Sequence, residues 1–593
     1  MGGAGSMGRG GFIRSPTQGE VSNSSTMRRP LDVSFRRNSG MAAGLNPLAG
    51  HGNHRYEWKL LALIRVFLIV PLGQYHDDHR RCEALKDVLA SSFNFETLAD
   101  MPDTPNATTL PTHNAGTRNR AGIEALYKLS DIIADNVKKI DTTLTEKGLD
   151  FPALDSPFNP GLEQESYGLP GVLDGAAIIA AAAAQLRATV YPAPMTLVNT
   201  ALLHNVSAAL SIAAETHVAE SLSSAGAQGL HVKELAKPSG IDPDKLSRVL
   251  RLLATYNFFR EVAPDVFAHN RLSSLLDTRK PIQAILEKPE KKHDGTLGLA
   301  AAVGQLTDEG MKSTSYLTET VLDPVSGHAN DITDLAFNRA FPDVKGTVWN
   351  FYDMEEQQYR RNRFAMTMEG SKHMSPAEAI VEGVDWTAPG PDALVVDVGG
   401  GVGAQSLTLS NKFQRLRFIV QDREQLITTD TKTFWQDANP DALKDGRVVL
   451  QAHDFFGPQP VKNADFFLIR MILHDYPDQD CLKILRNLRT AAKPSTQLIV
   501  VDNIMSYACD EPAANEIPGA AITPPPAPLL PNLGQANSTA YLMDVLMMAL
   551  TGGTERTLTQ VRTLLAEAGW KVTRVHHGAP FVLSHQKVIA VPA

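Results

Sequence analysis

Residues 394–403 read LVVDVGGGVG, and this stretch decides the fold of the chain. Its first three residues are apolar without polar alternation, which is typical of a central strand that is covered on both faces. The glycines that follow let the backbone turn tightly and approach a ligand closely. Residues 404–413 then have the apolar spacing of a helix that packs on a sheet. The stretch therefore predicts a strand, a loop and a helix around a nucleotide pocket.

Two classes of cofactor fit this glycine loop. Gly399, Gly401 and Ala404 match the dinucleotide fingerprint G-x-G-x-x-G/A. A second strand is predicted over residues 418–422, and it ends in Asp422, about 20 residues after the loop, where a carboxylate can bind a ribose. An NAD-dependent oxidoreductase and an S-adenosylmethionine-dependent enzyme both predict this acid.

Two further features favour S-adenosylmethionine. Asp397 precedes the first fingerprint glycine by two residues. Its carboxylate can accept a hydrogen bond from a ligand ammonium, whereas it would repel a pyrophosphate. Residues 571–575 and 588–591 read as a hairpin around a turn at 578–580, and a doubly wound sheet that ends in an antiparallel hairpin is the pattern of S-adenosylmethionine methyltransferases. Neither Asp397 nor the C-terminal hairpin is expected in an NAD-dependent oxidoreductase.

The candidate catalytic residues follow two later strands. Residues 466–469 are apolar and predict a strand, and His474 comes just after it in the sequence RMILHDYP. Asp502 follows the next predicted strand, 498–501. Because ligands of open α/β sheets bind at the carboxyl ends of the strands, we expect His474, Asp397 and Asp422 to converge on one site, which Asp502 joins.

Transfer of a methyl group from a sulfonium to a hydroxyl needs a base that removes the hydroxyl proton. Histidine is suited to this because its unperturbed pKa is about 6.5. A neighbouring carboxylate can fix its tautomer and stabilise the imidazolium. Asp502 and Glu555 are the candidates for that carboxylate, and His474 is the candidate base.

The chain resembles the caffeate-type small-molecule O-methyltransferases of plants and fungi. The motifs that carry the resemblance are LVVDVGGGVG (394–403), QDREQLI (421–427), HDFFGP (453–458), LHDYPDQDCLKILRN (473–487) and GGTERT (552–557). The resemblance implies an α/β Rossmann-like methyltransferase domain, preceded by an α-helical winged-helix dimerisation domain. It also implies a homodimer that uses S-adenosyl-L-methionine.

The resemblance implies a role for each matching residue. At the reaction centre, His474 would be the base, and Asp502 and Glu555 its flanking acids. The cofactor site would consist of Asp422 at the ribose, Asp454 and Phe455 at the adenine, Gly399 at the methionine end, Arg470 at a polar edge, and Asp397 and Gly401 in the strand and loop beneath. No metal ligand is implied.

Two departures from the family pattern stand out. Asp502 is one methylene shorter than the glutamate that plant members carry, so its contact with His474 is less secure than that of Glu555. Residues 510–538 form an insertion with three consecutive prolines at 524–526 and many alanines. Its composition predicts a flexible surface excursion that builds no packed element.

The winged-helix part also follows from local patterns. Helices are predicted over 217–222, 232–236 and 242–256, and a hairpin over 258–262 and 266–268. Winged helices often bind DNA. Here the third helix opens with Asp242 and Asp244, and the chain carries a formal charge of −9, neither of which suits a surface that faces phosphates.

These patterns predict four regions: a mostly disordered extension (1–122), the helical and winged-helix dimerisation domain (123–285), a helical linker around the substrate pocket (286–385), and the methyltransferase domain (386–593). An apolar helix over 176–186 is too short to span a bilayer, which takes roughly 20 residues, and therefore predicts an interface rather than membrane association. Three cysteines without metal or disulfide spacing are typical of a reduced, cytoplasmic protein.

The sequence therefore predicts an S-adenosylmethionine-dependent O-methyltransferase that acts on a hydroxyl of an aromatic or polyketide-like small molecule. It predicts a homodimer and no nucleic-acid partner. The alternative is a catalytically inactive, methyltransferase-like regulator that uses its winged helix to bind protein or DNA. The presence of Asp397, Asp422, His474 and the glycine loop argues against such decay.

Overall fold

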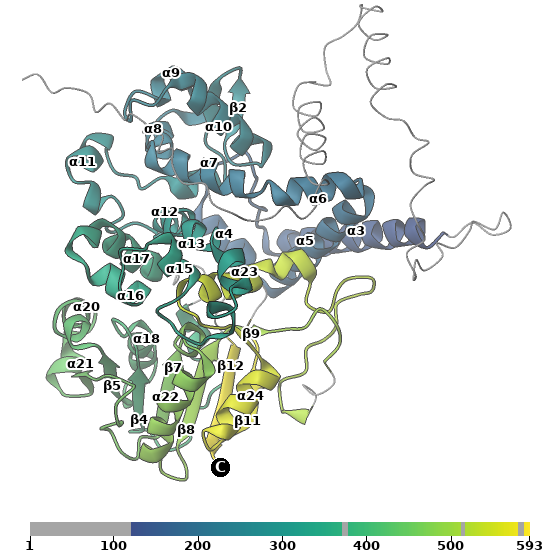
Figure 1. The fold of residues 1–593 in the computed structure, drawn as a ribbon. Coiled ribbons are helices and arrows are strands. Elements are labelled where there is room, and N and C mark those ends of the chain that lie inside the picture. Colours follow the sequence, from purple (N-terminus) through teal and green to yellow (C-terminus); the bar gives the residue numbers. More distant parts are fainter. Residues whose placement is uncertain (1–119, 371–376, 512–515, 579–585) are drawn as a thin grey trace, which may run out of the picture. The chain divides into compact units, whose positions relative to one another are not determined.

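The computed structural model describes residues 120–370, 377–511, 516–578 and 586–593. Almost all of the predicted disordered extension lies outside these residues, and so does most of the turn that joins the predicted C-terminal hairpin. The described residues belong to one compact unit, and Figure 1 shows its elements.

A mixed sheet of seven strands carries the candidate site. Its strand order is β11-β12-β8-β7-β4-β5-β6, with β4 (Leu394–Val398) paired in parallel with a neighbour on each side. β12 runs antiparallel to both β8 and β11, which confirms the predicted C-terminal hairpin. The other strands are β5 (Arg417–Asp422), β6 (Val448–Ala452), β7 (Phe466–Arg470), β8 (Gln497–Asp502), β11 (Trp570–His576) and β12 (Gln586–Pro592).

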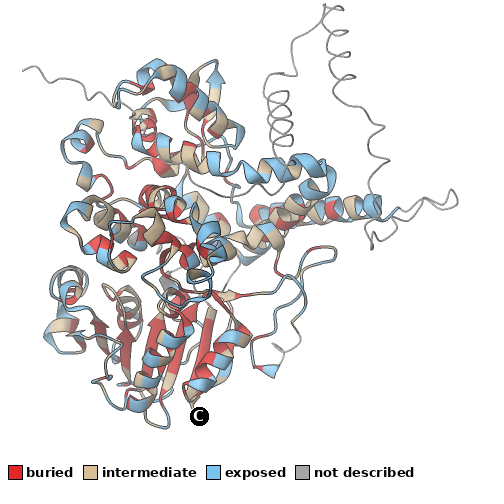
Figure 2. Ribbon diagram, in the orientation of Figure 1, coloured by how far each residue is buried: buried red, intermediate tan, exposed pale blue. Residues whose placement is uncertain are grey.

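Helices cover both faces of this sheet, as the uninterrupted apolar strands predict. Val396 and Val398 of β4 pack against α22 (Asp478–Ala491) and α24 (Leu558–Glu567). Val395 packs on the opposite face, in a cluster with α18 (Ala404–Lys412), α20 (Lys432–Ala438) and α21 (Pro440–Lys444). Figure 2 shows the buried residues concentrated along the strands. This arrangement confirms the doubly wound fold.

A small winged-helix unit precedes the sheet in the chain. Its helices are α7 (His204–Glu215), α8 (Val218–Leu222), α9 (Val232–Leu235) and α10 (Pro243–Thr255). Its strands β1 (Leu230–His231), β2 (Arg260–Ala263) and β3 (Val266–Ala268) form a sheet in the order β1-β3-β2. Asp242 caps α10 by accepting a hydrogen bond from the Lys245 amide at 3.0 Å. The predicted three helices and wing hairpin are therefore confirmed.

The helices before this unit differ from the prediction in length. The apolar helix α5 runs from Pro170 to Val190, 21 residues, because a proline starts it well before the alanine run. By length and composition α5 could cross a bilayer, and so could α6 (Ala193–Ala201) and α7 together, which meet at a bend of 41°. The expectation that the apolar helix is too short to span a membrane is thus wrong. Its buried alanines pack against Leu129 of α3 (Ala121–Lys147).

A group of short helices links the winged-helix unit to the sheet. They are α12 (Leu299–Gln305), η5 (Leu306–Gly310), α13 (Met311–Thr314), α14 (Leu317–Leu322), α15 (Ala336–Ala340), α16 (Val348–Asp353) and α17 (Gln358–Gly370). Phe337 and Phe351 from this group pack with Leu546 and Met547 of α23 (Ser538–Leu550). An aromatic and methionine-lined core therefore lies beside the methyltransferase domain.

The insertion at 510–538 packs more than its composition predicts. Leu529 is buried against α3 and α5, and Gln185 of α5 donates to the Pro528 carbonyl at 2.9 Å. Ile517 and Ala520 are buried in the core beneath α24. The expectation that this stretch builds no packed element is wrong for these residues, since a few apolar anchors hold the proline-rich segment and its end forms the short helix η13 (Gly534–Asn537).

Candidate active site

The glycine loop lies over a buried carboxylate. Asp397 of β4 is 2% exposed, and the Ser406 hydroxyl of α18 donates to its Oδ2 at 2.6 Å. A Cβ atom on Gly400 would lie 2.7 Å from the Asp397 carboxyl carbon, so the loop needs glycine there. Burial raises the pKa of Asp397 to about 6, while Ser406 and the positive charge of Arg470 oppose the shift.

Asp422 meets the same loop from the end of β5. Its Oδ2 accepts a hydrogen bond from the Gly401 amide at 2.9 Å, and its Oδ1 accepts one from the Arg423 amide at 2.8 Å. The carboxylate is therefore held at the loop, beside the carboxyl end of the sheet. Strand pairing between β4 and β5 places the two acids on neighbouring strands, as the sequence predicts.

The next strand ends in a cluster of aromatic rings. Asp454 follows β6 and accepts from the Phe456 amide at 3.0 Å. The rings of Phe455 and Phe456 both meet Tyr476 edge-on, at centroid distances of 5.9 and 5.3 Å. A Cβ atom on Gly399 would approach Phe455 to 3.4 Å, so the glycine loop and this aromatic cluster are in contact. Phe455, which is predicted to contact the adenine, thus lies next to Gly399, which is predicted to lie at the methionine end of the cofactor.

Arg470 ends β7 between two of the predicted acids. Its Nε is buried and has no hydrogen-bond partner among the described residues. Burial lowers the pKa of Arg470, and the charges of Asp397 and Asp502 oppose this. A buried donor without a partner costs free energy unless a ligand accepts from it. Arg470 therefore offers a polar contact at this edge, as the family resemblance implies.

Asp502 holds a backbone turn. Its Oδ1 accepts from the amide of Met471 at 3.0 Å, and Met471 has a positive φ of 53°. The hydrogen bond stabilises a backbone conformation that residues with a Cβ rarely adopt. Among the described contacts, Asp502 makes no hydrogen bond to His474, although its charge acts on that residue. Asp502 therefore lies near the histidine and acts on it through its charge, and its role as a flanking acid stays a prediction.

His474 and Glu555 form the centre of the site. His474 lies on the short helix η11 (Leu473–Asp475), and its Nδ1 is 2.9 Å from Glu555 Oε1. The Asn503 side chain donates to the same carboxylate oxygen at 3.1 Å, and Asp544 of α23 accepts from the Glu555 amide at 2.9 Å. Both members of the pair are buried. Glu555 is thus fixed from three elements and in turn orients the imidazole.

Asp475 is a member of the site that was not predicted. Its Oδ1 lies 3.6 Å from Nε2 of His474, on the side of the ring opposite Glu555. The HDYP motif places this acid directly after the histidine, and that adjacency was the signal available in the sequence. Asn503 was not predicted either, and it too comes directly after a predicted site residue, Asp502.

The carboxylates determine the protonation of His474. Burial alone lowers the pKa of an imidazole, but Asp475 and Glu555, with Asp502 behind them, outweigh it and raise the pKa of His474 to about 10. Burial also raises the pKa of Asp502 to about 7, against the attraction of His474. The site therefore contains one imidazole among several acids, which is an environment that favours a cationic ligand.

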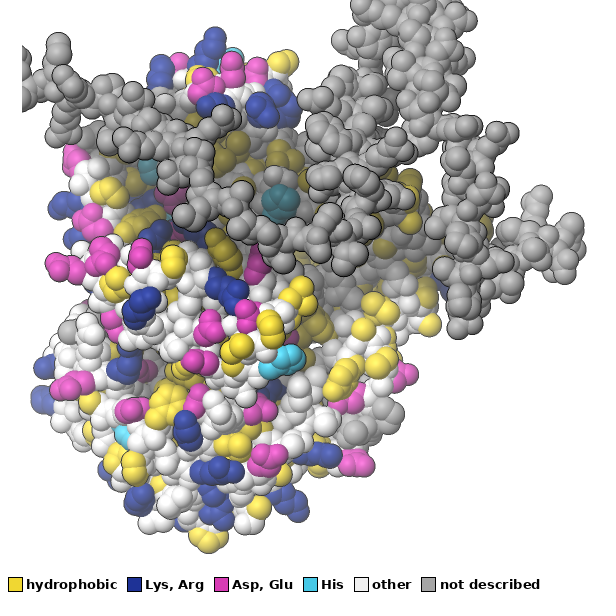
Figure 3. Space-filling view, in the orientation of Figure 1, with side chains coloured by type: hydrophobic (Ala, Val, Ile, Leu, Met, Phe, Trp, Pro, Cys, Tyr) yellow, Lys and Arg dark blue, Asp and Glu magenta, His cyan; other side chains and the backbone are white. Residues whose placement is uncertain are grey.

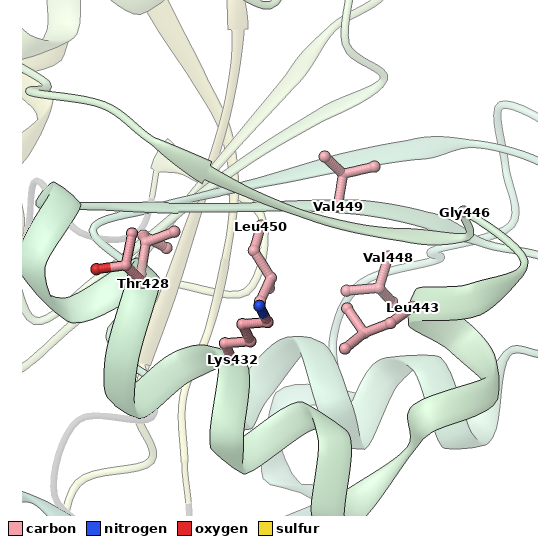
Figure 4. A pocket seen from close by; sticks show the side chains of 8 residues that line it. Thr428, Lys432, Leu443, Gly446, Val448, Val449 and Leu450 are labelled. Carbon is pink, nitrogen blue, oxygen red and sulfur yellow. The ribbon is translucent and has the colours of Figure 1, made fainter.

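Two of the cavities between described residues of the methyltransferase domain bear on the site. One of about 10 Å³ adjoins the pair, lined by residues that include His474, Asn503, Glu555 and Arg556. The other, about 470 Å³, lies at the open edge of the sheet between β6 and the helices after β5, where Val449, Leu450 and Lys432 line it (Figure 4). None of the candidate site residues lines this second cavity, so it lies apart from the reaction centre.

Comparison with known proteins identifies the family. The model of the O-methyltransferase domain matches residues 319–522, and that of the O-methyltransferase dimerisation domain matches residues 198–279. The chain is 41% identical to 4-O-methyltransferase 1 of Phanerochaete chrysosporium over 475 residues, which cover 79% of this chain and 99% of that protein. It is 32% identical to 3-O-methyltransferase 2 of the same fungus, over 82% of this chain and 99% of that protein.

Solved structures support the fold. The mitomycin 7-O-methyltransferase MmcR matches with a TM-score of 0.50 and 23% identity, over 68% of this chain and 98% of its own. LepI, solved in complex with S-adenosylmethionine, matches with a TM-score of 0.54 and 20% identity, over 73% of this chain and 97% of its own. At such identities the likeness shows the fold alone. The long matches at higher identity show more: this chain belongs to the O-methyltransferase family and is an S-adenosylmethionine-dependent O-methyltransferase of the secondary-metabolite type.

Proposed function

We propose that this enzyme methylates a hydroxyl of an aromatic or polyketide-like small molecule, and that His474 is the general base. The observation that carries the proposal is the 2.9 Å contact between His474 Nδ1 and Glu555. This contact occupies Nδ1, and we assign the substrate hydroxyl to Nε2, which lies 3.6 Å from Asp475 Oδ1. A histidine oriented in this way by a buried carboxylate is the arrangement that general-base catalysis requires.

The residues present fit S-adenosylmethionine, which supplies an electrophilic methyl group on a sulfonium. Its ammonium and sulfonium charges suit the acids that surround the glycine loop and His474. Gly399, which has a positive φ of 68°, leaves no room for a side chain beside Ile472 and Phe455 and so allows close approach of a ligand. We assign Asp422 to the ribose and Phe455 to the adenine, and Arg470 to a polar group of the same ligand.

The proton of the substrate hydroxyl would pass to His474. The neighbouring carboxylates raise the pKa of His474 and so favour the imidazolium, which cannot accept a proton. The active fraction therefore grows as the pH rises toward that pKa. Glu555 stabilises the imidazolium that forms after proton transfer, since its carboxylate already contacts Nδ1.

The linker helices offer an aromatic substrate a suitable wall. Phe337, Phe341 and Phe351 pack against one another in tilted and edge-on geometries at centroid distances of 5.0 to 5.6 Å. They pack against α23, whose end leads directly into the segment that carries Glu555. A Cβ atom on Gly552 in that segment would meet Leu335 at 3.3 Å. This aromatic and methionine cluster is therefore connected through α23 to the segment that carries Glu555, and we assign it to the side of the site that faces the substrate.

A homodimer completes the proposal. The dimerisation model matches from residue 198, inside α6, and no residue of that helix is buried. Residues 188–214 contain no Asp, Glu, Lys or Arg, and Leu197 and Leu202 are 74% and 50% exposed. An uncharged apolar helix of this kind is typical of a surface that a second copy covers. Light scattering should therefore give a dimer, and Leu197→Asp should shift it toward monomer. A monomeric parent protein would contradict this part of the proposal.

No observation favours the inactive regulator. On the face in Figure 3, acidic and basic side chains are interspersed without a basic patch. The glycine loop, Asp422 and the His474–Glu555 pair are all in place. The test is transfer of labelled methyl from S-adenosylmethionine to a panel of phenols and hydroxylated polyketides. Transfer that is lost in His474→Ala supports the proposal, and a wild-type rate in that variant would exclude His474 as the base.

A further inference from the structure

Arg556 connects the segment that carries Glu555 to the turn that carries His474. It follows Glu555 in the chain and is 5% exposed. Its guanidinium donates to the carbonyls on both sides of the histidine: Nη1 to Leu473 O at 2.6 Å and Nη2 to Tyr476 O at 2.8 Å. It also donates to Thr554 O at 3.3 Å. One side chain thus bridges the two halves of the catalytic pair.

The turn around His474 has two backbone hydrogen bonds of its own, from the Asp475 amide to Ile472 O and from the Tyr476 amide to Leu473 O, and contacts from other segments hold it as well. It is a single short helical turn, Leu473–Asp475, followed by a proline at 477. The His474 carbonyl accepts from the Thr554 amide at 2.9 Å, and a Cβ atom on Gly553 would lie 1.9 Å from that oxygen. The Cys481 thiol contacts the same two carbonyls that Arg556 binds, at 3.2 and 3.4 Å. These contacts tie the carbonyls of the turn to the Glu555 segment and to α22.

Strand pairing, a helix cap and an ion pair hold Arg556 in place. It belongs to β10 (Arg556–Thr557), which pairs in parallel with β9 (Ile504–Met505). The next residue, Thr557, caps α24 with a reciprocal contact to Gln560. The Asp478 carboxylate, which is mostly exposed, accepts from Arg556 Nε at 2.9 Å and neutralises the buried charge. The guanidinium therefore has a fixed position from which to orient the turn.

We propose that Arg556 is a positioning residue for the proposed base. Its planar fork fixes the backbone on both sides of His474 and so keeps Nδ1 at hydrogen-bond distance from Glu555. A lysine cannot replace it fully, because a single ammonium cannot reach two carbonyls and a carboxylate in the same plane. The inference rests on the proposed function, since it assumes that His474 accepts the substrate proton.

The role of Arg556 is separable from direct catalysis. Among its described hydrogen bonds, none goes to the imidazole or to the Glu555 carboxylate. Loss of Arg556 should therefore misplace the base without changing the cofactor residues at the glycine loop. A misplacement of about 1 Å costs on the order of 10²-fold in rate.

The experiment compares Arg556→Met and Arg556→Lys with the parent enzyme. We expect kcat to fall about 100-fold in Arg556→Met and less in Arg556→Lys, with KM and the affinity for S-adenosylhomocysteine changed less than about twofold. The control is Arg562→Met, which removes an exposed arginine of α24 that pairs with Glu516. If Arg556→Met does not fold, the same measurements on Arg556→Lys are compared with those on the parent enzyme.

A double-mutant cycle with His474→Ala identifies the route of the effect. If Arg556 acts through His474, the Arg556 substitution should cause no further loss of kcat once the histidine is gone. An equal loss in both backgrounds, or a loss confined to KM, would overturn the inference. An active His474→Ala enzyme would instead remove the proposed base, so the two failures are distinguishable.

Discussion

Nδ1 of His474 lies 2.9 Å from Oε1 of Glu555, although the two residues are separated by 81 positions in the chain. The fold brings them together because β7 and β8 are neighbours and the segment after α23 returns to β9 beside them. The pair therefore depends on tertiary packing, and neither residue is oriented by its own secondary structure. This makes the geometry sensitive to substitutions that leave both residues intact.

Removal of the base should have the largest effect on turnover. His474→Ala should lower kcat by about 10²- to 10⁴-fold, the usual contribution of a positioned general base. Glu555→Gln should cost less, because it disturbs the orientation and charge of the imidazole without removing it. Single-turnover transfer of labelled methyl measures both, with Glu567→Gln, an exposed glutamate of α24, as the control. A larger loss in Glu555→Gln than in His474→Ala would contradict this assignment.

The parts of the fold that were predictable are those with local patterns. The apolar runs of β4, β7 and β8 have no polar alternation, and that property follows from burial on both faces. The glycine loop and the acid at the end of β5 were predictable because the turn after β4 needs glycine, as at Gly400, and because Asp422 comes at the end of an apolar strand. Helix α10 was predictable from its apolar spacing and its Asp242 cap.

The parts that could not be predicted depend on packing between distant segments. Nothing local predicts that the Arg556 guanidinium binds the carbonyls of Leu473 and Tyr476. The composition of the insertion is misleading because it averages over residues, whereas one anchor such as Leu529 is enough to hold a segment in place. Asp475 does not end a strand as Asp422 and Asp502 do, and its place in the site follows from its direct adjacency to the histidine.

The anchoring of the insertion can be tested by stability. Leu529 is 7% exposed in a cluster with α3 and α5, and its neighbour Leu530 is 45% exposed. Leu529→Ala should lower the free energy of unfolding by about 2–4 kcal/mol through lost burial and the cavity left behind. Leu530→Ala, the matched control, should change it by less than about 0.5 kcal/mol. Chemical denaturation measures both, and equal small effects would show that the insertion does not anchor on these helices.

The ribose contact can be tested by calorimetry. Asp422→Ala should weaken binding of S-adenosylhomocysteine by about 1.5–3 kcal/mol, because charge-assisted hydrogen bonds to the ribose are lost. Asp441→Ala, at an exposed position of α21, should leave the affinity unchanged. Titration of NAD in parallel should show no binding to the parent protein. Equal affinity of Asp422→Ala and the parent for S-adenosylhomocysteine would remove Asp422 from the cofactor site.

The pH dependence tests the role of Asp475. The carboxylates around His474 raise its pKa to about 10, and only the neutral imidazole can accept a proton. The rate of the parent enzyme should therefore rise as the pH increases from neutral toward that pKa. In Asp475→Asn one of the charges that stabilise the imidazolium is gone, so the pKa of His474 should fall and the inflection should move to lower pH.

The measurement is single-turnover methyl transfer to a phenol whose own pKa lies above the range studied, so that ionisation of the substrate does not mask that of the enzyme. Glu567→Gln is the control, since it neutralises an exposed carboxylate of α24. At neutral pH Asp475→Asn holds a larger fraction of neutral imidazole than the parent. Its rate should therefore fall less steeply as the pH is lowered from 9 to 7. An inflection at the same pH in Asp475→Asn and the parent would show that the carboxylate 3.6 Å from Nε2 does not control the base.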